Sequence, residues 1–195
     1  MNPREAILRK VGEGIDVKRQ FFEENATRIG DMCQLMARRF LEGRKLFVMG
    51  NGGSACDALH VAVEFKHPII AKRRPLPCEA LMCDVATVSA ISNDQDFSRI
   101  FVNQLRLLAQ PGDMTLAIST SGKSPNLIYA LEAARARGLM TIAFSGKDGG
   151  RLPEIVEFCF TVPSFSIHRI QEIHATMIHV VWDMVHVALG EEDVI

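Results

Sequence analysis

The sequence predicts an α/β fold of three layers, with a five-stranded parallel sheet between two layers of helices. Five short apolar segments of strand length recur along the chain, and helical patterns separate them. Because parallel strands need long crossover connections, this alternation favours right-handed βαβ units. Two of the strands are followed directly by glycine-rich or hydroxyl-rich turns, which is typical of the ligand-binding edge of such a sheet.

The composition indicates one globular domain over residues 1–195. Hydrophobic residues make up 48% of the chain and charged residues 23%, which is ordinary for a protein with a substantial core. We expect a helical pair over residues 1–43 and an α/β core over residues 44–195. The net charge of −1 gives no reason to expect a nucleic-acid or anionic-membrane partner.

The cysteines and the apolar runs predict a cytoplasmic protein. The five cysteines are scattered and include no C-x-x-C pair, so neither a disulfide framework nor a thiolate zinc site is indicated. The N-terminal residues lack the apolar core of a signal peptide, and no apolar run approaches the roughly 20 residues needed to span a bilayer. Secretion and membrane insertion are therefore not expected.

Two helices are expected before the first strand. Residues 4–24 have a helical but imperfect apolar pattern, which Gly12 and Gly14 interrupt. Residues 29–41 make a more regular amphipathic helix that stops at Gly43. Since this pair lies outside the alternating unit, it either covers the core or packs against another subunit.

The remaining elements are expected in alternation, joined by short turns and one longer connection. Strands are predicted over Leu46–Met49, Cys78–Met82, Met114–Ile118, Met140–Phe144 and Val156–Val162. Helices are predicted from Ser54, from Asp84 to Ile91, over Phe97–Ala109, over Leu127–Arg137 after Pro125, and over Arg169–Leu189. The basic segment Lys66–Pro77 contains three prolines and is predicted to be a loop or extended connection.

The turn after the first strand predicts a small anion site. In the run from Gly50 to Ser54, glycines allow positive φ and leave the backbone N–H groups open to a ligand. A helix start directly after the turn favours an anion. His60 and Glu64 follow on one face of that helix, so an imidazole and a carboxylate lie further along. The alternative is a plain turn with a surface His–Glu pair.

A second loop after a strand carries four hydroxyl groups, from Ser119, Thr120, Ser121 and Ser124. With a helix start beside them, these groups can surround the oxygens of a phosphate. The spacing matches neither the nucleotide P-loop nor the dinucleotide motif, so the loop favours a phosphosugar over a nucleotide as its ligand. A purely structural Ser/Thr-rich turn is the alternative. Because both loops follow parallel strands, they should meet at one edge of the sheet.

The last helix carries polar residues that an apolar pattern alone does not require. Gln171 and His179 are separated by about 80° around the helix axis and roughly 12 Å along it. They can approach one small ligand only if their side chains lean together or a neighbouring subunit takes part. His174 and His186 are expected to be solvated or core-edge residues.

Taken in order, these motifs resemble the sugar isomerase (SIS) domain of bacterial phosphoheptose isomerases, a flavodoxin-like fold. The similar stretches are 50–54, His60 with Glu64, Asn93-Asp94, 119–124, 146–150 and 169–179. The resemblance covers nearly the whole chain, and it implies interconversion of sedoheptulose 7-phosphate and D-glycero-D-manno-heptose 7-phosphate. That reaction is an early step towards the heptose of bacterial lipopolysaccharide. The resemblance also implies a homotetramer with sites at subunit contacts.

The resemblance assigns roles to individual residues. The substrate contacts that it implies are Asn51, Gly52, Gly53, Ser54, His60, Glu64, Asn93, Asp94, Ser119, Thr120, Ser121, Ser124 and Gln171. The zinc ligands that it implies, for one ion per subunit, are His60, Glu64, Gln171 and His179. Glu64 and His179 match the catalytic acid–base pair of the family.

The residue types suit this reaction. A ketose becomes an aldose when a proton leaves the carbon beside the carbonyl and returns to the neighbouring carbon through a cis-enediol. A carboxylate is a competent base for that transfer, and an imidazole can move a proton between the two oxygens near neutral pH. Zinc would polarise the carbonyl. A carboxylate bound to zinc is a weaker base, so the metal and base roles of Glu64 compete.

The segment after Glu64 leaves other functions open. The family usually has an arginine there, whereas this chain has Lys66-His67-Pro68. The positive charge of that arginine would have to come from Lys66, Lys72, Arg73 or Arg74. One alternative is therefore an isomerase of another phosphorylated ketose. A second is a non-catalytic tetrameric adaptor that binds the bacterial replication initiator, and a third is a sugar-phosphate sensor. The presence of Glu64 and His179 favours an enzyme over the adaptor.

Overall fold

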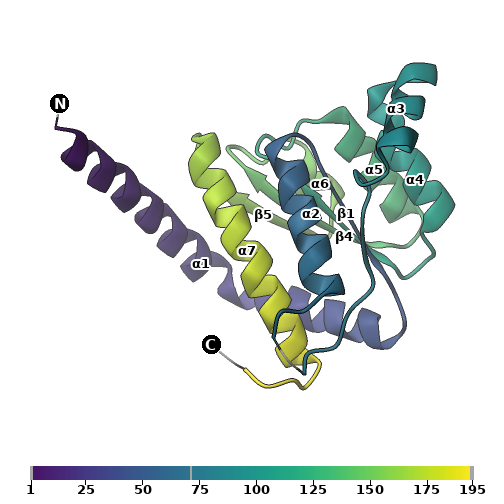
Figure 1. The fold of residues 1–195 in the computed structure, drawn as a ribbon, viewed down its shortest axis with the longest axis horizontal. Coiled ribbons are helices and arrows are strands. Elements are labelled where there is room, and N and C mark those ends of the chain that lie inside the picture. Colours follow the sequence, from purple (N-terminus) through teal and green to yellow (C-terminus); the bar gives the residue numbers. More distant parts are fainter. Residues whose placement is uncertain (1, 71, 194–195) are drawn as a thin grey trace.

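A computed structural model describes residues 2–70 and 72–193 as three layers, with a parallel sheet between two groups of helices (Figure 1). The strand order is β2-β1-β3-β4-β5, and every pairing is parallel. The strands are β1 (Leu46–Gly50), β2 (Cys78–Ala80), β3 (Met114–Ile118), β4 (Met140–Gly146) and β5 (Phe158–Val162). The predicted fold class is confirmed. The order reverses between β1 and β3, which is where sheets of this kind bind ligands.

Helices cover both faces of the sheet. One face packs against α1 (Pro3–Leu41), α2 (Gly53–Lys66) and α7 (Ile167–Ala188), and the other against α3 (Val85–Asp94), α4 (Ile100–Leu108), α5 (Pro125–Ala136) and α6 (Leu152–Ile155). Side chains alternate between the two cores along each strand, so Leu46 and Val48 face one core while Phe47 and Met49 face the other. The strands are buried on both sides, which explains their continuous apolar sequence.

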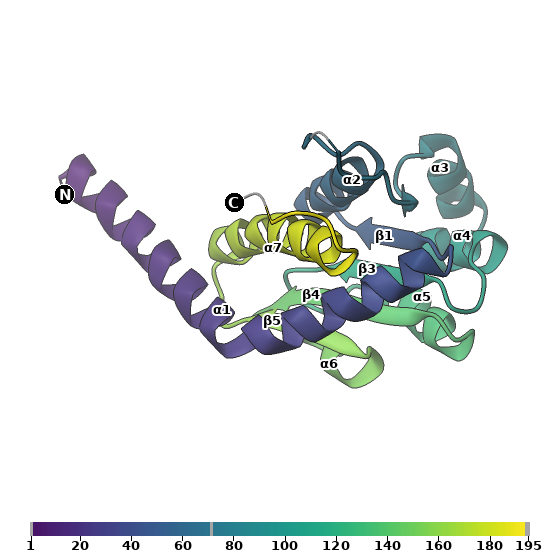
Figure 2. The ribbon, with the colours of Figure 1, turned by 90° about the horizontal axis from the view of Figure 1, so that it is seen from below.

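The two expected N-terminal helices are one helix, α1, of 39 residues. Gly12 and Gly14 do not interrupt it, because a glycine weakens a helix by only about 1 kcal/mol and packing can offset that cost. Gly14 is buried, and a Cβ added there would lie 2.7 Å from the Arg169 guanidinium of α7. Figure 2 shows α1 bending where it reaches the sheet and projecting well beyond it.

Other differences concern the ends of elements. Asp84 caps α3 as expected, by accepting from the Thr87 N–H at 2.9 Å, but α3 continues through Asn93 and Asp94 instead of breaking there. The predicted helix over 97–109 begins with a separate 3₁₀ turn, η1 (Phe97–Arg99). The short α6 was not predicted, since four residues are too few for a periodic pattern. Residue 71, in the predicted connection Lys66–Pro77, lies outside the described residues.

Within the described ranges, no helix has the length and apolar character needed to cross a bilayer.

Candidate functional site

The two predicted ligand loops lie at one edge of the sheet. Their strands β1 and β3 are direct neighbours, and Gly50 at the end of β1 pairs in register with Ile118 at the end of β3. Asn51 and Asn126 join the two loops, because the amide of each donates to the amide oxygen of the other, at 3.0 and 2.8 Å. The expectation that the loops share an edge is therefore confirmed.

The first loop makes a tight turn from β1 into α2. A Cβ at Gly50 would lie 2.2 Å from the carbonyl oxygen of Ser54, so no other residue fits that position without a shift of the backbone. Gly52 has a φ of +54° and precedes the first residue of α2. Helix α2 thus begins one residue before Ser54, which is buried in the turn, with its N–H donating to the Asn51 carbonyl.

The second loop is held by its own hydroxyl groups. The backbone N–H of Gly122 donates to the Ser119 hydroxyl at 3.1 Å, and that of Lys123 donates to the Ser121 hydroxyl at 3.3 Å. Ser119 is buried, whereas Thr120, Ser121 and Ser124 are half-buried at the start of α5. The last three hydroxyl groups are therefore partly accessible to a ligand.

The loop after β4 supports the hydroxyl-rich loop from behind. A Cβ at Gly122 would lie 1.9 Å from the Gly149 carbonyl oxygen, so the two backbones are in direct contact. The Arg151 N–H donates to the Gly122 carbonyl at 3.1 Å. Lys123 forms an ion pair with Asp148 at 2.9 Å, and this exposed pair draws the lysine toward the supporting loop.

His60, Glu64 and His179 form a compact group between α2 and α7. The His60 Nε2 lies 3.3 Å from the Glu64 Oε1 and 3.2 Å from the His179 Nε2. One donor atom from each residue lies within 4.8 Å of the other two. His60 and Glu64 are half-buried and His179 is exposed. This group is a candidate metal-binding site, since two imidazole nitrogens and a carboxylate oxygen converge on one point.

Asp57 lies one helical turn before His60 on α2. Burial raises the pKa of its carboxyl group, and the neighbouring His60 opposes that shift. One of its oxygens is buried without a hydrogen-bond partner among the described residues. In the sequence, only the spacing of three from His60, a helical neighbour position, marks this residue.

Gln171 of α7 lies beside the start of α2. A Cβ at Gly53 would lie 2.4 Å from its Nε2, so the Gln171 side chain rests on the first turn of α2. His179 lies beside His60, and His60 comes seven residues after Gly53 on α2. The separation predicted from helix geometry therefore persists in the single chain, and a shared ion for Gln171 and His179 stays a prediction.

Asn93 and Asp94 are exposed at the end of α3, where the Asn93 amide donates to the Asp94 carboxylate at 2.8 Å. Contact between these two residues and the loops stays a prediction.

A cavity of about 400 Å³ lies between the two loops and η1. Its lining residues are Asn51, Asp96, Phe97, Ser98, Ser124, Pro125 and Asn126. Residues 96–98 were not predicted to be part of the site, because their one recognisable signal is an aspartate that caps a short turn.

Two other histidines of α7 are in the core rather than in solvent. His174 is 1% exposed and its Nε2 lies 3.0 Å from the Ser145 carbonyl oxygen. Burial lowers the pKa of His174 to about 4. His186 is fully buried, with Nδ1 2.9 Å from a carboxylate oxygen of Glu191. As expected, neither belongs to the candidate site, although neither is solvated.

The cations after α2 do not provide a free arginine. Arg73 is buried and forms an ion pair with Asp183 of α7. Arg74 forms an ion pair with Glu191 at 2.8 Å. Lys66 and Lys72 are exposed. Of these four residues, only the two lysines form no ion pair within the described part of the chain.

The fold and the site define a SIS domain, and the family model of the SIS domain matches residues 12–146. The phosphoheptose isomerase of Thermodesulfovibrio yellowstonii is 42% identical over 191 residues, which are 98% of this chain and 95% of that protein. The chain belongs to the phosphoheptose isomerase family, and it is by family an isomerase.

Two solved structures agree with this assignment. The phosphoheptose isomerase of Francisella tularensis has a TM-score of 0.90 and 32% identity, covering 95% of this chain and 98% of that chain. The phosphoheptose isomerase GmhA of Neisseria gonorrhoeae has a TM-score of 0.88 and 33% identity, covering 94% of this chain and 98% of that chain. The similarity extends over α1, which is therefore part of the family fold.

Proposed function

We propose that this enzyme interconverts sedoheptulose 7-phosphate and D-glycero-D-manno-heptose 7-phosphate through a cis-enediol, in bacterial heptose biosynthesis. The observation that carries the proposal is the group of His60 and Glu64 on α2 with His179 of α7, because α2 is the helix that begins at the glycine-rich loop. A proton-transfer group and an anion-binding edge on one helix are what a phosphosugar isomerase requires. The isomerase names of the relatives support the same reaction class.

The hydroxyl-rich loop would hold the phosphate. Thr120, Ser121 and Ser124 are partly accessible, and the N-terminus of α5 follows them, so neutral donors and the helix dipole both favour an anion. The Asn51–Asn126 pair fixes the distance between this loop and the turn over residues 50–54. Substrate contacts by Asn93, Asp94 and Gln171 are part of the proposal.

Glu64 and His179 would carry out the proton transfers. Glu64 takes the proton from the hydroxyl-bearing carbon beside the ketone while protonated His179 gives its proton to the carbonyl oxygen, which yields the enediol. Neutral His179 then takes the proton from the neighbouring hydroxyl oxygen, and Glu64 returns its proton to the carbon that carried the ketone, which leaves the aldose. No proton is gained or lost overall. General acid–base groups in such positions contribute typically 10²- to 10⁴-fold in rate.

A zinc ion fits the donor group. Zinc takes imidazole nitrogen and carboxylate oxygen as ligands, and His60, Glu64 and His179 offer two such nitrogens and one such oxygen within 4.8 Å of one another. A cation would also satisfy the facing ring nitrogens together. When bound, zinc supplies a Lewis acid that polarises the carbonyl and stabilises negative charge on oxygen. Gln171 is the proposed fourth ligand.

Proton NMR in D₂O tests the reaction directly. The zinc-loaded protein should convert sedoheptulose 7-phosphate to the aldose and incorporate deuterium at the exchanging carbon. Glu64→Gln should lower turnover by about 10²-fold or more while sugar-phosphate binding stays measurable by calorimetry. Glu132→Gln is the matched control, because Glu132 is an exposed residue of α5 that forms an ion pair with Arg151. Near-normal turnover in Glu64→Gln would remove this residue from the mechanism.

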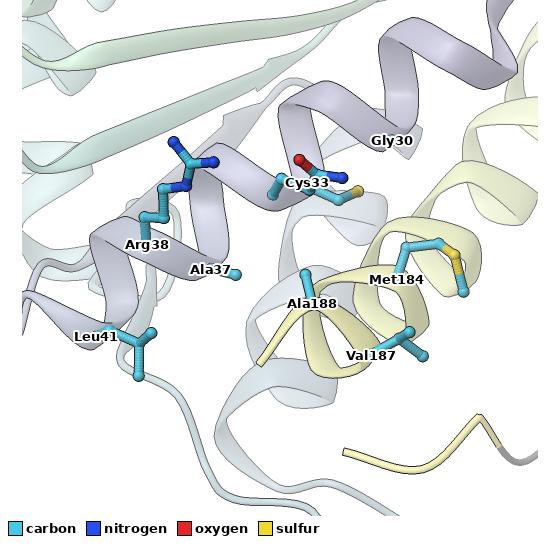
Figure 3. Close-up of a pocket in the computed structure, with 9 residues that line it drawn as sticks. Gly30, Cys33, Ala37, Arg38, Leu41, Met184, Val187 and Ala188 are labelled. Carbon is cyan, nitrogen blue, oxygen red and sulfur yellow. The ribbon is translucent and has the colours of Figure 1, made fainter. Parts of the chain in front are cut away.

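A homotetramer is part of the proposal, and two exposed apolar regions support self-association. The projecting half of α1 carries Ile7, Leu8, Val11 and Ile15, each between 51% and 61% exposed. A cavity of about 380 Å³ also lies between α1 and α7, where Leu41, Met184 and Val187 surround a mostly apolar hollow (Figure 3). Light scattering of the wild type and of the Val11→Glu variant tests this, and a monomeric wild type would contradict it.

The runner-up is an isomerase of the same mechanism that acts on another phosphorylated ketose. It is supported by the burial of Arg73 in an ion pair with Asp183, since this arginine is then unavailable to a sugar. Turnover of a panel of ketose phosphates distinguishes the two.

The adaptor and sensor alternatives would need no proton-transfer group, so the convergence of Glu64 and His179 argues against them. Five free cysteines suit the reducing cytoplasm that we propose as its location.

A further inference from the structure

Glu64 lies in the last turn of α2, where a helix is least stable. The final four carbonyl groups of a helix have no partner within it. Here the chain supplies partners for two of them from elsewhere. The Trp182 indole N–H donates to the Glu64 carbonyl oxygen at 2.8 Å, and the Leu76 N–H donates to the Phe65 carbonyl oxygen at 2.7 Å.

Trp182 stands three residues after His179 on α7, so one side chain connects the helix of the proposed acid to the backbone of the proposed base. Helices α2 and α7 lie side by side in both Figure 1 and Figure 2. Trp182 is 5% exposed, and it is the only tryptophan of the sequence. Because the ring is large and buried, the indole N–H stays directed at the Glu64 carbonyl oxygen.

Arg73 holds the tryptophan in place. Its guanidinium lies 4.6 Å from the centre of the Trp182 ring, within the range of a cation–π contact. The same guanidinium forms an ion pair with Asp183 and donates to the Glu192 carbonyl at 3.1 Å. The indole also lies against His186, whose ring centre is 5.0 Å away. The indole is therefore enclosed by charged and aromatic groups.

We propose that Trp182 is a positioning residue, which sets the distance between Glu64 and His179 by bonding the Glu64 backbone, and that Arg73 orients Trp182 for this role. The inference rests on the proposed function, since it assigns the end of α2 a part in the reaction. It also explains why Arg73 is buried beside α7 instead of facing the substrate.

Trp182→Phe removes the indole N–H and keeps an aromatic ring. We expect kcat to fall about tenfold or more, because displacement of a proton-transfer group by 1 Å can cost 10²-fold. The KM should change by less than about twofold, because the proposed phosphate loop is untouched. Zinc affinity should fall as well, since Glu64 is a proposed ligand. Arg73→Gln, which keeps the tryptophan, should reproduce a smaller part of each effect.

The matched control is Phe160→Leu, which removes atoms from the same core cluster but on β5, the edge strand farthest from β2. It should lower stability without changing kcat or zinc affinity. Equal losses of kcat in Phe160→Leu and Trp182→Phe, or unchanged kcat in both Trp182→Phe and Arg73→Gln, would overturn the proposal.

Hydrogen–deuterium exchange separates this proposal from the proposed function, since it needs no substrate. Exchange of the backbone amides over residues 64–67 should be faster in Trp182→Phe than in the wild type, and unchanged in Phe160→Leu. If the wild type lacks turnover but this exchange effect is present, the reaction is wrong and the helix-end bond stands. If Trp182→Phe does not fold, the same exchange measurement on Arg73→Gln decides, and unchanged exchange there overturns the proposal.

Discussion

Asn51 and Asn126 exchange two amide hydrogen bonds across the switch point of the sheet, although 75 residues separate them in sequence. The Asn126 side chain is 2% exposed, and its amide oxygen also accepts from the Leu127 N–H at 3.0 Å. This single side chain therefore closes the first turn of α5 and joins the two ligand loops.

We predict that Asn126→Ala lowers both stability and substrate affinity. The substitution removes both hydrogen bonds of the Asn51 amide, while the Leu127 N–H keeps the Ser124 carbonyl as its partner, and the loss costs about 2 kcal/mol of unfolding free energy. The loops would also separate, so the KM for sugar phosphate should rise more than kcat falls. Denaturant unfolding and steady-state kinetics measure the two effects. Asn103→Ala, which breaks an exposed bond to Gln95, should change neither.

Gly122→Ala should damage the hydroxyl-rich loop beyond the ordinary cost of a side chain at positive φ. Gly122 has a φ of +63°, and its added Cβ would overlap the Gly149 carbonyl, so the loop must move. We expect the KM for sugar phosphate to rise about tenfold or more. The control is Gly138→Ala, where φ is +76° but no described atom lies within 4 Å of the new Cβ. Equal KM values in the two variants would contradict the prediction.

Removal of metal should abolish turnover and lower the melting temperature. A ligand that binds only the folded state stabilises it by mass action, so chelation should destabilise the wild type and added zinc should restore both properties. His60→Ala should not respond to zinc in either assay. His67→Ala is the control, because His67 is exposed at the end of α2, outside the donor group. Full activity in metal-free protein, verified by elemental analysis, would exclude a metal role.

Stability should fall as the pH falls from 6.5 toward 4. His174 is buried in its neutral form, and its pKa is lowered from 6.5 to about 4 by burial. The unfolded chain therefore binds a proton in this interval that the folded chain does not, which gives a loss of about 3 kcal/mol by pH 4 from this group. Above pH 6.5 the contribution is fully present.

Denaturant titrations at several pH values measure this slope. His174→Gln can still donate to the Ser145 carbonyl but does not titrate, so its stability should depend less on pH than that of the wild type. Burial also lowers the pKa of His186, and that second slope should persist in the variant. Identical pH profiles for the two proteins would mean that His174 does not carry the effect.

The sequence by itself determined the strands, the loops and the class of chemistry. Each depends on short-range patterns: an apolar run sets β1, glycines and hydroxyl groups mark the turns after β1 and β3, and a spacing of four puts His60 and Glu64 on one helical face. Because parallel strands present their carboxyl ends at one edge, the meeting of the two loops also followed from local signals.

Only the tertiary structure decided how distant segments meet. Packing of α1 against α7 made one helix of the expected two, since a glycine costs less than the burial gained along the helix. The approach of His179 to His60 depends on how α7 lies on α2, across 119 residues of sequence. The direction of the Arg73 side chain was likewise set by Asp183, because a buried cation requires a partner and sequence spacing does not reveal which one.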